Sequence, residues 1–132
     1  MTEFWRVCHR TSVDEESGTF AGPYQGPGWP GQYRMGLAHN DSDHLAPHEE
    51  ASDLRDWWFD NRGEAVCGCR SLDDLLQWFE GYLWAMVRRG YVIRAYEVPS
   101  DQIRLSDDTG QAVAIVRPEM LVIECEIMEV LG

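Results

Sequence analysis

The strongest local pattern in the sequence is an amphipathic helix that begins at Ser71 and ends near Gly90. Apolar residues recur there at spacings of three and four: Leu72, Leu75, Leu76, Phe79, Leu83, Met86 and Val87. Ser71 is a favourable N-cap, and two aspartates follow in the first turn, where the helix dipole favours negative charge. We expect Gly81 to interrupt this helix and Gly90 to end it.

Segments typical of β-strands lie on both sides of that helix. Alternating or β-branched apolar runs predict strands over residues 4–9, 65–69, 91–98, 111–116 and 120–130. A further helix is expected over residues 49–60, with Leu54, Trp57 and Trp58 facing the core. Residues 22–48 look irregular. At 132 residues the chain has the length of one domain. We therefore predict a single small α+β domain with a mixed, mostly antiparallel β-sheet and two or three helices.

Acidic residues dominate the charge. The chain has 23 acidic and 11 basic residues, with a net charge of −12, and every basic residue is arginine. Such a charge repels phosphate backbones and anionic lipids, so we expect no direct binding to nucleic acid and no membrane partner. A basic protein partner fits the charge, and so does acidity that only maintains solubility. The candidate partner surface is residues 41–60, where seven acids accompany only Arg55.

The sequence contains no pattern of an export signal or a membrane span. Residues 1–10 lack a charged segment followed by an apolar one, and no apolar run reaches the roughly 18 residues that a bilayer requires. We expect a cytoplasmic protein. The four cysteines, at 8, 67, 69 and 125, lie in strand-like segments, so reduced and mostly buried thiols are expected.

Metal and nucleophile chemistry have little support in the residue spacing. His39, His44 and His48 could join the Cys67–Cys69 pair, but C-x-C is not the usual zinc knuckle and no second cysteine pair follows. Surface histidines and structural thiols explain these residues better, and we predict no metal site. Phosphate-loop, Rossmann, serine hydrolase and zincin motifs are also absent from the sequence.

Two other features are candidates for ligand binding. The glycine- and proline-rich segment 22–33 carries Tyr24, Trp29 and Tyr33, whose rings suit stacking on a ligand or, equally, capping the core. Glu124 and Glu126 share one face of a strand, about 7 Å apart, which is within reach of one small ligand. A solvated face of the sheet is the commoner explanation for such a pair.

Four segments together resemble the ADP-ribosyltransferase superfamily: WRVCH at 5–9, CGCRSLDDLLQWF at 67–79, VIRAYEVP at 92–99 and RPEMLVIECEI at 117–127. The rifampin-modifying branch is most similar in the C-terminal half. The resemblance implies an ADP-ribosyltransferase-like fold and NAD as cofactor. The same segments also resemble a group of small phage and prophage proteins of GC-rich bacteria. Small acidic phage proteins include inhibitors of host defence, anti-CRISPR proteins among them.

Carried over to this chain, the resemblance assigns the cofactor-binding residues. The first-strand residue that holds the dinucleotide would be Arg6, with His9 as a lesser candidate, and the serine of the strand-to-helix junction would be Ser71. The aromatic ring that stacks on nicotinamide would come from Tyr24, Tyr33 or Trp29.

The catalytic acid is less clearly assigned by the resemblance. Asp107 or Asp108 matches the rifampin-type position, Gln111 stands where other branches have a glutamate, and Glu124 is a geometric alternative. Three hypotheses follow: an enzyme that transfers ADP-ribose to a host target, a non-catalytic acidic inhibitor that mimics nucleic acid on a basic host complex such as a CRISPR component, and an assembly protein with tryptophan anchors.

Overall fold

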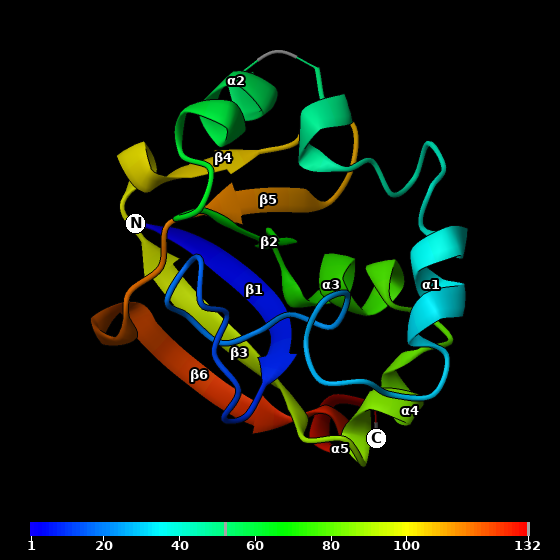
Figure 1. Cartoon of the computed structure of the whole chain (residues 1–132). Helices are drawn as coiled ribbons and strands as arrows, with labels where there is room; N and C mark the ends of the chain where they lie inside the picture. The colour runs from blue at the N-terminus through cyan, green and yellow to red at the C-terminus, as the bar shows by residue number, and fades with distance from the viewer. Residues whose placement is uncertain (52, 132) are drawn as a thin grey trace.

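Six strands form one open sheet in the computed structural model of the protein, which describes residues 1–51 and 53–131. The strand order is β4-β5-β2-β1-β3-β6, and every described pair is antiparallel (Figure 1). The strands are β1 (Thr2–His9), β2 (Val66–Cys69), β3 (Tyr91–Val98), β4 (Ile103–Leu105), β5 (Gln111–Ala114) and β6 (Leu121–Glu126). The expected α+β class and predominantly antiparallel sheet are confirmed.

The sheet is continuous but diverges at its centre. β1 and β3 pair over eight residues, from Thr2 opposite Val98 to His9 opposite Tyr91. β1 and β2, in contrast, share a single aligned pair, Trp5 with Cys69. In Figure 1 the strands β4, β5 and β2 accordingly run in a different direction from β1, β3 and β6. This divergence leaves room for a cavity beside β1 and β2.

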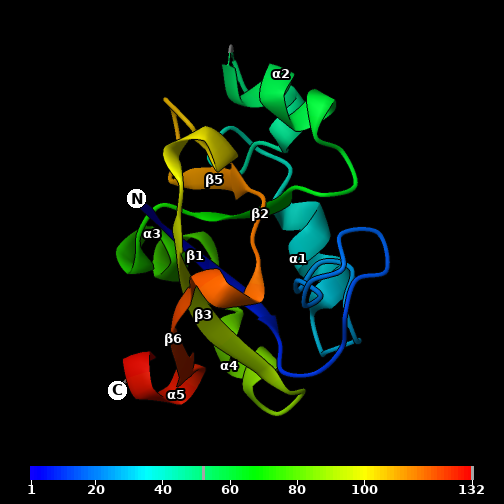
Figure 2. The same ribbon diagram turned by 90° about the vertical axis from the view of Figure 1, so that its left-hand side faces the viewer.

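Successive side chains of β1 point to opposite faces of the sheet, so β1 contributes to two apolar cores, one on each face. Trp5 and Val7 belong to the core covered by helices, whereas Phe4 belongs to a second core with residues of β2, β3, β4 and β5. The helices are α1 (Gln32–Ala38), α2 (Asp53–Asp60), α3 (Leu72–Trp78), α4 (Leu83–Val87) and α5 (Ile127–Leu131). In Figure 2 α3 and α5 lie to the left of the strands, and Met35 of α1 belongs to the same helical core as residues of α3, α4 and α5.

The helical segment after Ser71 forms as its sequence predicts. The Ser71 hydroxyl accepts a hydrogen bond from the Asp74 amide at 3.1 Å. Gly81, with φ of 89°, separates α3 from α4, and Gly90 has φ of 86° just before β3. Both glycines occupy left-handed backbone conformations that side chains disfavour, so they fix the interruption and the end of the helical segment.

The expected helix over 49–60 is shorter than predicted. A 3-10 turn spans Pro47–Glu49 and α2 begins at Asp53, while residue 52 lies outside the described residues. Leu54 is buried, but Trp57 and Trp58 are only partly buried. The irregular conformation expected for residues 32–38 was wrong, because α1 forms there around the fully buried Met35.

The C-terminal part of the chain also differs from the prediction. The expected strand over 120–130 ends at Glu126, and α5 follows with Ile127 buried against the helical core. β5 ends at Ala114 rather than at residue 116, and the short strand β4 was not predicted. The described residues therefore contain five α-helices instead of two or three.

Candidate functional site

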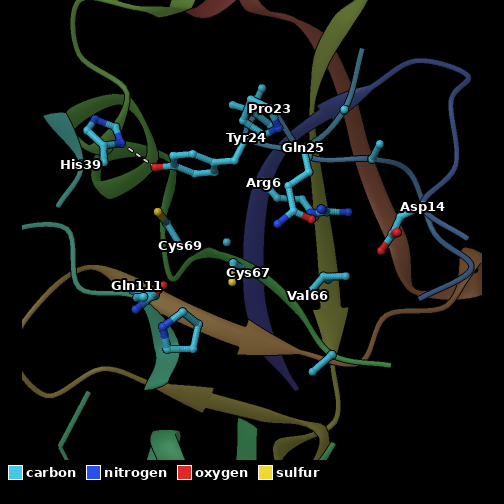
Figure 3. A pocket seen from close by; sticks show the side chains of 18 of the residues that line it. Arg6, Asp14, Pro23, Tyr24, Gln25, His39, Val66, Cys67, Cys69 and Gln111 are labelled. Carbon is cyan, nitrogen blue, oxygen red and sulfur yellow. Dashed lines mark hydrogen bonds between the residues drawn. The ribbon is translucent and has the colours of Figure 1, made fainter. Parts of the chain in front are cut away.

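A cavity of about 870 Å³ lies beside β1 and β2, at the divergence of the sheet. Strand residues Arg6, Cys67 and Cys69 and the first residue of β5, Gln111, line it. Its walls are formed by segments 12–16, 21–27 and 44–48, and by His39; Tyr24 belongs to the second of these segments (Figure 3). We call it the Arg6 cavity. Three residues that the resemblance had singled out, Arg6, Tyr24 and Gln111, are therefore brought together in one place.

Arg6 is a buried cation with few partners. Its side chain comes from the centre of β1, and the residue is only 5% exposed. Nη1 donates to the Phe20 carbonyl at 2.8 Å, but buried Nε has no partner among the described residues, and none of their carboxylates forms an ion pair with it. Gly22 leaves space here, since a Cβ would lie 3.2 Å from Nη2. An uncompensated buried charge is costly, so the Arg6 guanidinium favours an anionic group beside it, although Asp14, Glu15 and Glu16 also line the cavity.

Gln111 is held by a buried acid. Its Nε2 donates to Glu50 Oε1 at 2.8 Å and to the Leu45 carbonyl at 2.9 Å. Glu50 is 1% exposed and also accepts from Ser106 Oγ at 2.8 Å. Both amide hydrogens of Gln111 are thereby used, which leaves its carbonyl oxygen as the group able to accept from a ligand. Glu50 therefore does not belong to the acidic surface expected over 41–60.

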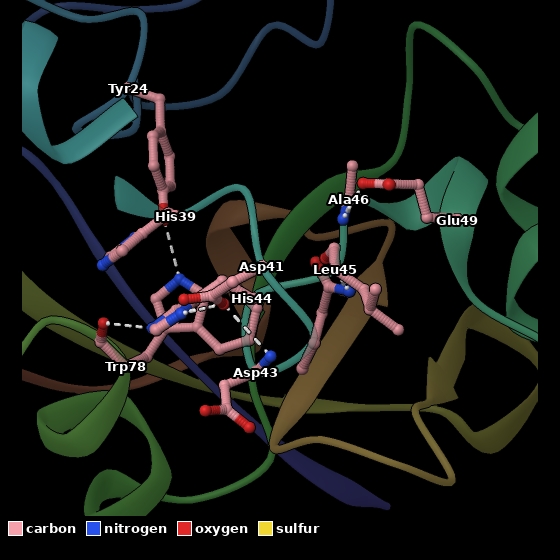
Figure 4. A network of polar contacts seen from close by, with 10 residues as sticks. Tyr24, His39, Asp41, Asp43, His44, Leu45, Ala46, Glu49 and Trp78 are labelled. Carbon is pink, nitrogen blue, oxygen red and sulfur yellow. Dashed lines mark hydrogen bonds and ion pairs between the residues drawn. The ribbon is translucent and has the colours of Figure 1, made fainter. Parts of the chain in front are cut away.

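Tyr24 lies in a hydrogen-bonded wall of the cavity. The Trp78 indole donates to the Tyr24 oxygen at 2.7 Å, and the Tyr24 hydroxyl bonds His39 Nδ1 (Figure 4). Since Trp78 can only donate, the Tyr24 proton is free to point at His39, which accepts as a neutral ring. Burial raises the pKa of Tyr24, and burial together with His44 lowers the pKa of His39 to about 4. These shifts favour neutral hydrogen bonding over proton transfer near neutral pH.

His44 stacks on His39 and fixes the loop that carries both histidines. The two rings are nearly parallel, with centroids 3.8 Å apart. His44 Nδ1 lies 2.9 Å from Asp41 Oδ1, and its Nε2 lies 3.1 Å from the Trp78 carbonyl. The contact with the Trp78 carbonyl ties this loop to α3. The hydrogen bond from His44 lowers the pKa of Asp41.

The thiols show no sign of activation. Cys8 and Cys69 are buried and Cys125 is half-buried, as expected, but Cys67 is exposed within the cavity. The protein surrounding it limits hydration and raises its pKa to about 11, an effect that Arg6 partly opposes. Among the described residues the cysteines are free, and no group of three His, Cys, Asp or Glu side chains is arranged to hold a metal ion.

The other candidate cofactor residues lie elsewhere. Ser71 caps α3 and is bonded to Asp74. His9 Nε2 contacts the Arg89 carbonyl at 3.0 Å, and Tyr33 on α1 is 81% exposed. Trp29 is buried in the helical core, where its indole donates to the Pro23 carbonyl. Within the aromatic segment 22–33, Trp29 therefore packs in the core and Tyr24 lines the Arg6 cavity.

The candidate acids do not line the Arg6 cavity. Asp107 is exposed, and Asp108 borders a separate hollow beside Arg70. Glu124 Oε1 accepts from Arg94 Nε at 2.7 Å on the far half of the sheet. Sequence reasoning missed Glu50 and the Tyr24–His39–His44 network as parts of this site. Glu50 looked like one more surface acid: it directly follows the 3-10 turn Pro47–Glu49, and no local pattern separates it from the exposed Glu49.

Within the part of the chain that is described, no helix is long and apolar enough to cross a bilayer.

Comparison with curated proteins and with solved structures found no match. A family of bacteriophage proteins matches residues 1–124, which is nearly the whole chain. The chain therefore belongs to the Bacteriophage T4 Y00F protein family.

Proposed function

We propose that this phage protein binds NAD⁺, or a closely related anionic nucleotide, in the Arg6 cavity and acts on a host target. The observation that carries the proposal is the buried Arg6 guanidinium, whose Nε lacks a partner among the described residues. A pyrophosphate supplies the acceptors and the negative charge that this group lacks. The resemblance to ADP-ribosyltransferases gives the same role to Arg6.

The cavity residues fit the parts of such a ligand. Arg6 would hold the pyrophosphate, and the aromatic ring of Tyr24 would border the nicotinamide. The carbonyl oxygen of Gln111, whose amide hydrogens are already bonded, would accept from a ribose hydroxyl. NAD⁺ supplies an ADP-ribosyl group whose bond to nicotinamide can break. The protein's share is to orient that group and to exclude water.

Gln111 limits the rate of such a reaction. A neutral amide steadies the developing positive charge of the ribose less than a carboxylate does. None of Asp107, Asp108 and Glu124 borders the Arg6 cavity. We therefore propose firm binding with slow ADP-ribosyl transfer, in which Gln111 positions the ribose.

Calorimetry with NAD⁺ tests the proposal, with nicotinamide release measured in parallel. Arg6→Gln is expected to weaken binding at least about tenfold, since it removes a charge-assisted contact. Arg117→Gln is the matched control, because Arg117 is exposed and its guanidinium bonds only Gln102 in the described chain. Absence of binding by the wild-type protein at millimolar NAD⁺ would sink the proposal.

A second function is favoured by the acidic surface around α2. Asp53, Asp56 and Asp60 are exposed on this helix, and the exposed Asp41, Asp43 and Glu49 precede it. Arg104 engages Asp53 and Arg55 contacts Asp56. In this alternative the protein is a non-catalytic inhibitor that occupies the nucleic-acid groove of a basic host complex, a CRISPR effector being one example.

Charge reversal distinguishes the second function from the first. Asp53→Arg with Asp56→Arg is expected to abolish competition with nucleic acid for the purified host complex, while NAD⁺ binding persists. Competition should also weaken steeply as salt is raised, because the contact is electrostatic. Unchanged competition by the doubly reversed protein rules this function out.

A further inference from the structure

The edge strand β6 exposes three consecutive apolar side chains. Leu121 is 38% exposed, Val122 is 52% exposed and Ile123 is 42% exposed. β6 forms one outer edge of the sheet, seen at the lower left of Figure 1. Isolated apolar residues on a surface are ordinary, but a consecutive run of three is unusual unless it serves an interface.

A β-bulge explains why all three side chains reach the surface. Ile123 aligns with Ala95 and Leu121 aligns with Tyr96, so Val122 is an additional residue on β6. Such an insertion bends the strand and redirects side chains that would otherwise alternate between the two faces. The bulge also disrupts regular edge pairing, so the side chains are better suited than the backbone to contact a partner.

Carboxylates without an ion pair lie near one end of this apolar run, and one of them, Glu3 on β1, accepts a hydrogen bond from the Trp5 indole. Glu119 precedes it in the chain, and Glu97 follows Tyr96 on β3, where its aligned partner on β1 is Glu3. All three glutamates are exposed, and none forms an ion pair among the described residues. The acids at the other end of β6 are different, because Arg94 binds Glu124 and Arg10 binds Glu126.

We propose that Leu121, Val122 and Ile123, with Glu3, Glu97 and Glu119 at their border, form a docking surface for a basic partner protein. We call it the β6 patch. Its apolar centre and charged border have the composition of a protein interface, and the carboxylates select arginine or lysine on the partner. A second copy of this chain would bring the same carboxylates and a further net charge of −12. The β6 patch lies outside the Arg6 cavity, and its role does not depend on a nucleotide.

The probe is a synthetic peptide of alternating arginine and valine, measured by fluorescence anisotropy against the full chain. We expect micromolar binding that Val122→Ser with Ile123→Thr weakens at least about tenfold, as expected for loss of interface anchors. Glu97→Gln with Glu119→Gln is expected to weaken binding about fivefold and to flatten its salt dependence. Trp84→Ser, at a 62% exposed residue on α4, is the matched apolar control and should leave binding unchanged.

Two further peptides and one hydrodynamic measurement complete the test. A peptide with glutamate in place of arginine should not bind, and one with serine in place of valine should bind at least fivefold more weakly. Thermal unfolding of each variant verifies the fold, which these exposed positions should not change. The proposal is overturned if all three peptides bind the wild-type protein equally. It is also overturned if the variant with Val122→Ser and Ile123→Thr binds the arginine–valine peptide as tightly as the wild type does. A wild-type dimer in sedimentation that this variant abolishes overturns it too, because the patch would then serve a second copy.

Discussion

Two buried arginines face each other across β1 and β3, and they differ in almost everything but position. Arg6 and Arg94 are aligned partners, 5% and 2% exposed. Arg94 donates to Glu124, to Cys8 Sγ and to the carbonyls of His9 and Arg10, and it stacks on the Phe20 ring at 3.7 Å. Among the described residues, the Arg6 guanidinium donates only to the Phe20 carbonyl.

The difference separates a structural arginine from a binding arginine. The partners of Arg94 come from the end of β1, from the segment that follows it and from β6, so its charge and its donors are matched within the fold. Arg6 has the same burial but borders a cavity, and its Nε is unmatched in the described chain. Burial alone therefore does not indicate the role of an arginine, whereas a census of its partners does.

The largest expected effect is on the structural member of the pair. Arg94→Met should lower the free energy of unfolding by about 2–3 kcal/mol, because the carbonyls of His9 and Arg10 lose their donor, whereas the half-exposed Glu124 can be hydrated. Urea titration followed by circular dichroism measures the change. A loss under about 1 kcal/mol would show that Arg94 does not fasten the segment after β1.

Arg6→Met should leave the free energy of unfolding almost unchanged but remove the stabilisation that a ligand gives. Its free energy of unfolding is expected to stay within about 1 kcal/mol of wild type, since the change removes an uncompensated charge. At a ligand concentration near 100 times Kd, pyrophosphate or NAD⁺ should stabilise the wild type by about 2.7 kcal/mol and the variant hardly at all. Thermal shift with and without ligand provides the measurement, and equal shifts in both proteins would contradict the comparison.

The wall opposite Arg6 should make stability depend on pH. The pKa of His39 falls from 6.5 to about 4 on folding, so between these values the unfolded chain binds a proton that the folded chain does not. Stability is then lost as pH falls from 6.5 towards 4. Because His39 is partly hydrated and neighbours Asp41 and His44, we expect only about 1 kcal/mol across this window. His39→Gln should reduce this slope in urea titrations, and an unchanged slope would contradict the assignment.

The smallest effect is expected at a surface ion pair on the Arg94 side. Arg10 Nη2 lies 2.6 Å from Glu126, with both side chains nearly half exposed. Arg10→Gln should change the free energy of unfolding by less than about 1 kcal/mol, because water screens such pairs. The same urea titration measures this change in stability. A loss as large as that of Arg94→Met would mean that solvent exposure does not explain why the two substitutions differ.

Local patterns predicted those elements that neighbouring residues determine. β3 has the predicted bounds, and Ser71, Gly81 and Gly90 fix the helical segment as expected. α5 was missed because its residues continue the alternation of β6, whereas Ile127, Val130 and Leu131 have the three- and four-residue spacing that packs on the core.

The candidate site was predicted only in part because distant contacts create it. The sequence places Arg6 within a strand. Only the fold shows that the Phe20 carbonyl accepts from Nη1 and that Nε has no acceptor among the described residues. Glu50 is buried because Ser106 and Gln111, more than fifty residues later, supply its hydrogen bonds. Nothing in the acidic sequence around Glu50 distinguishes it from its exposed neighbours.

The central position of β1 has a consequence for synthesis in the infected cell. β1 is translated before both of its neighbours in the sheet, β2 at Val66–Cys69 and β3 at Tyr91–Val98. Its eight-residue pairing with β3 closes a loop of more than eighty residues at His9 and Tyr91. The pairing of β1 with β3 therefore cannot form until Val98 has been translated, and until then the apolar residues of β1 depend on chaperones or transient collapse for protection.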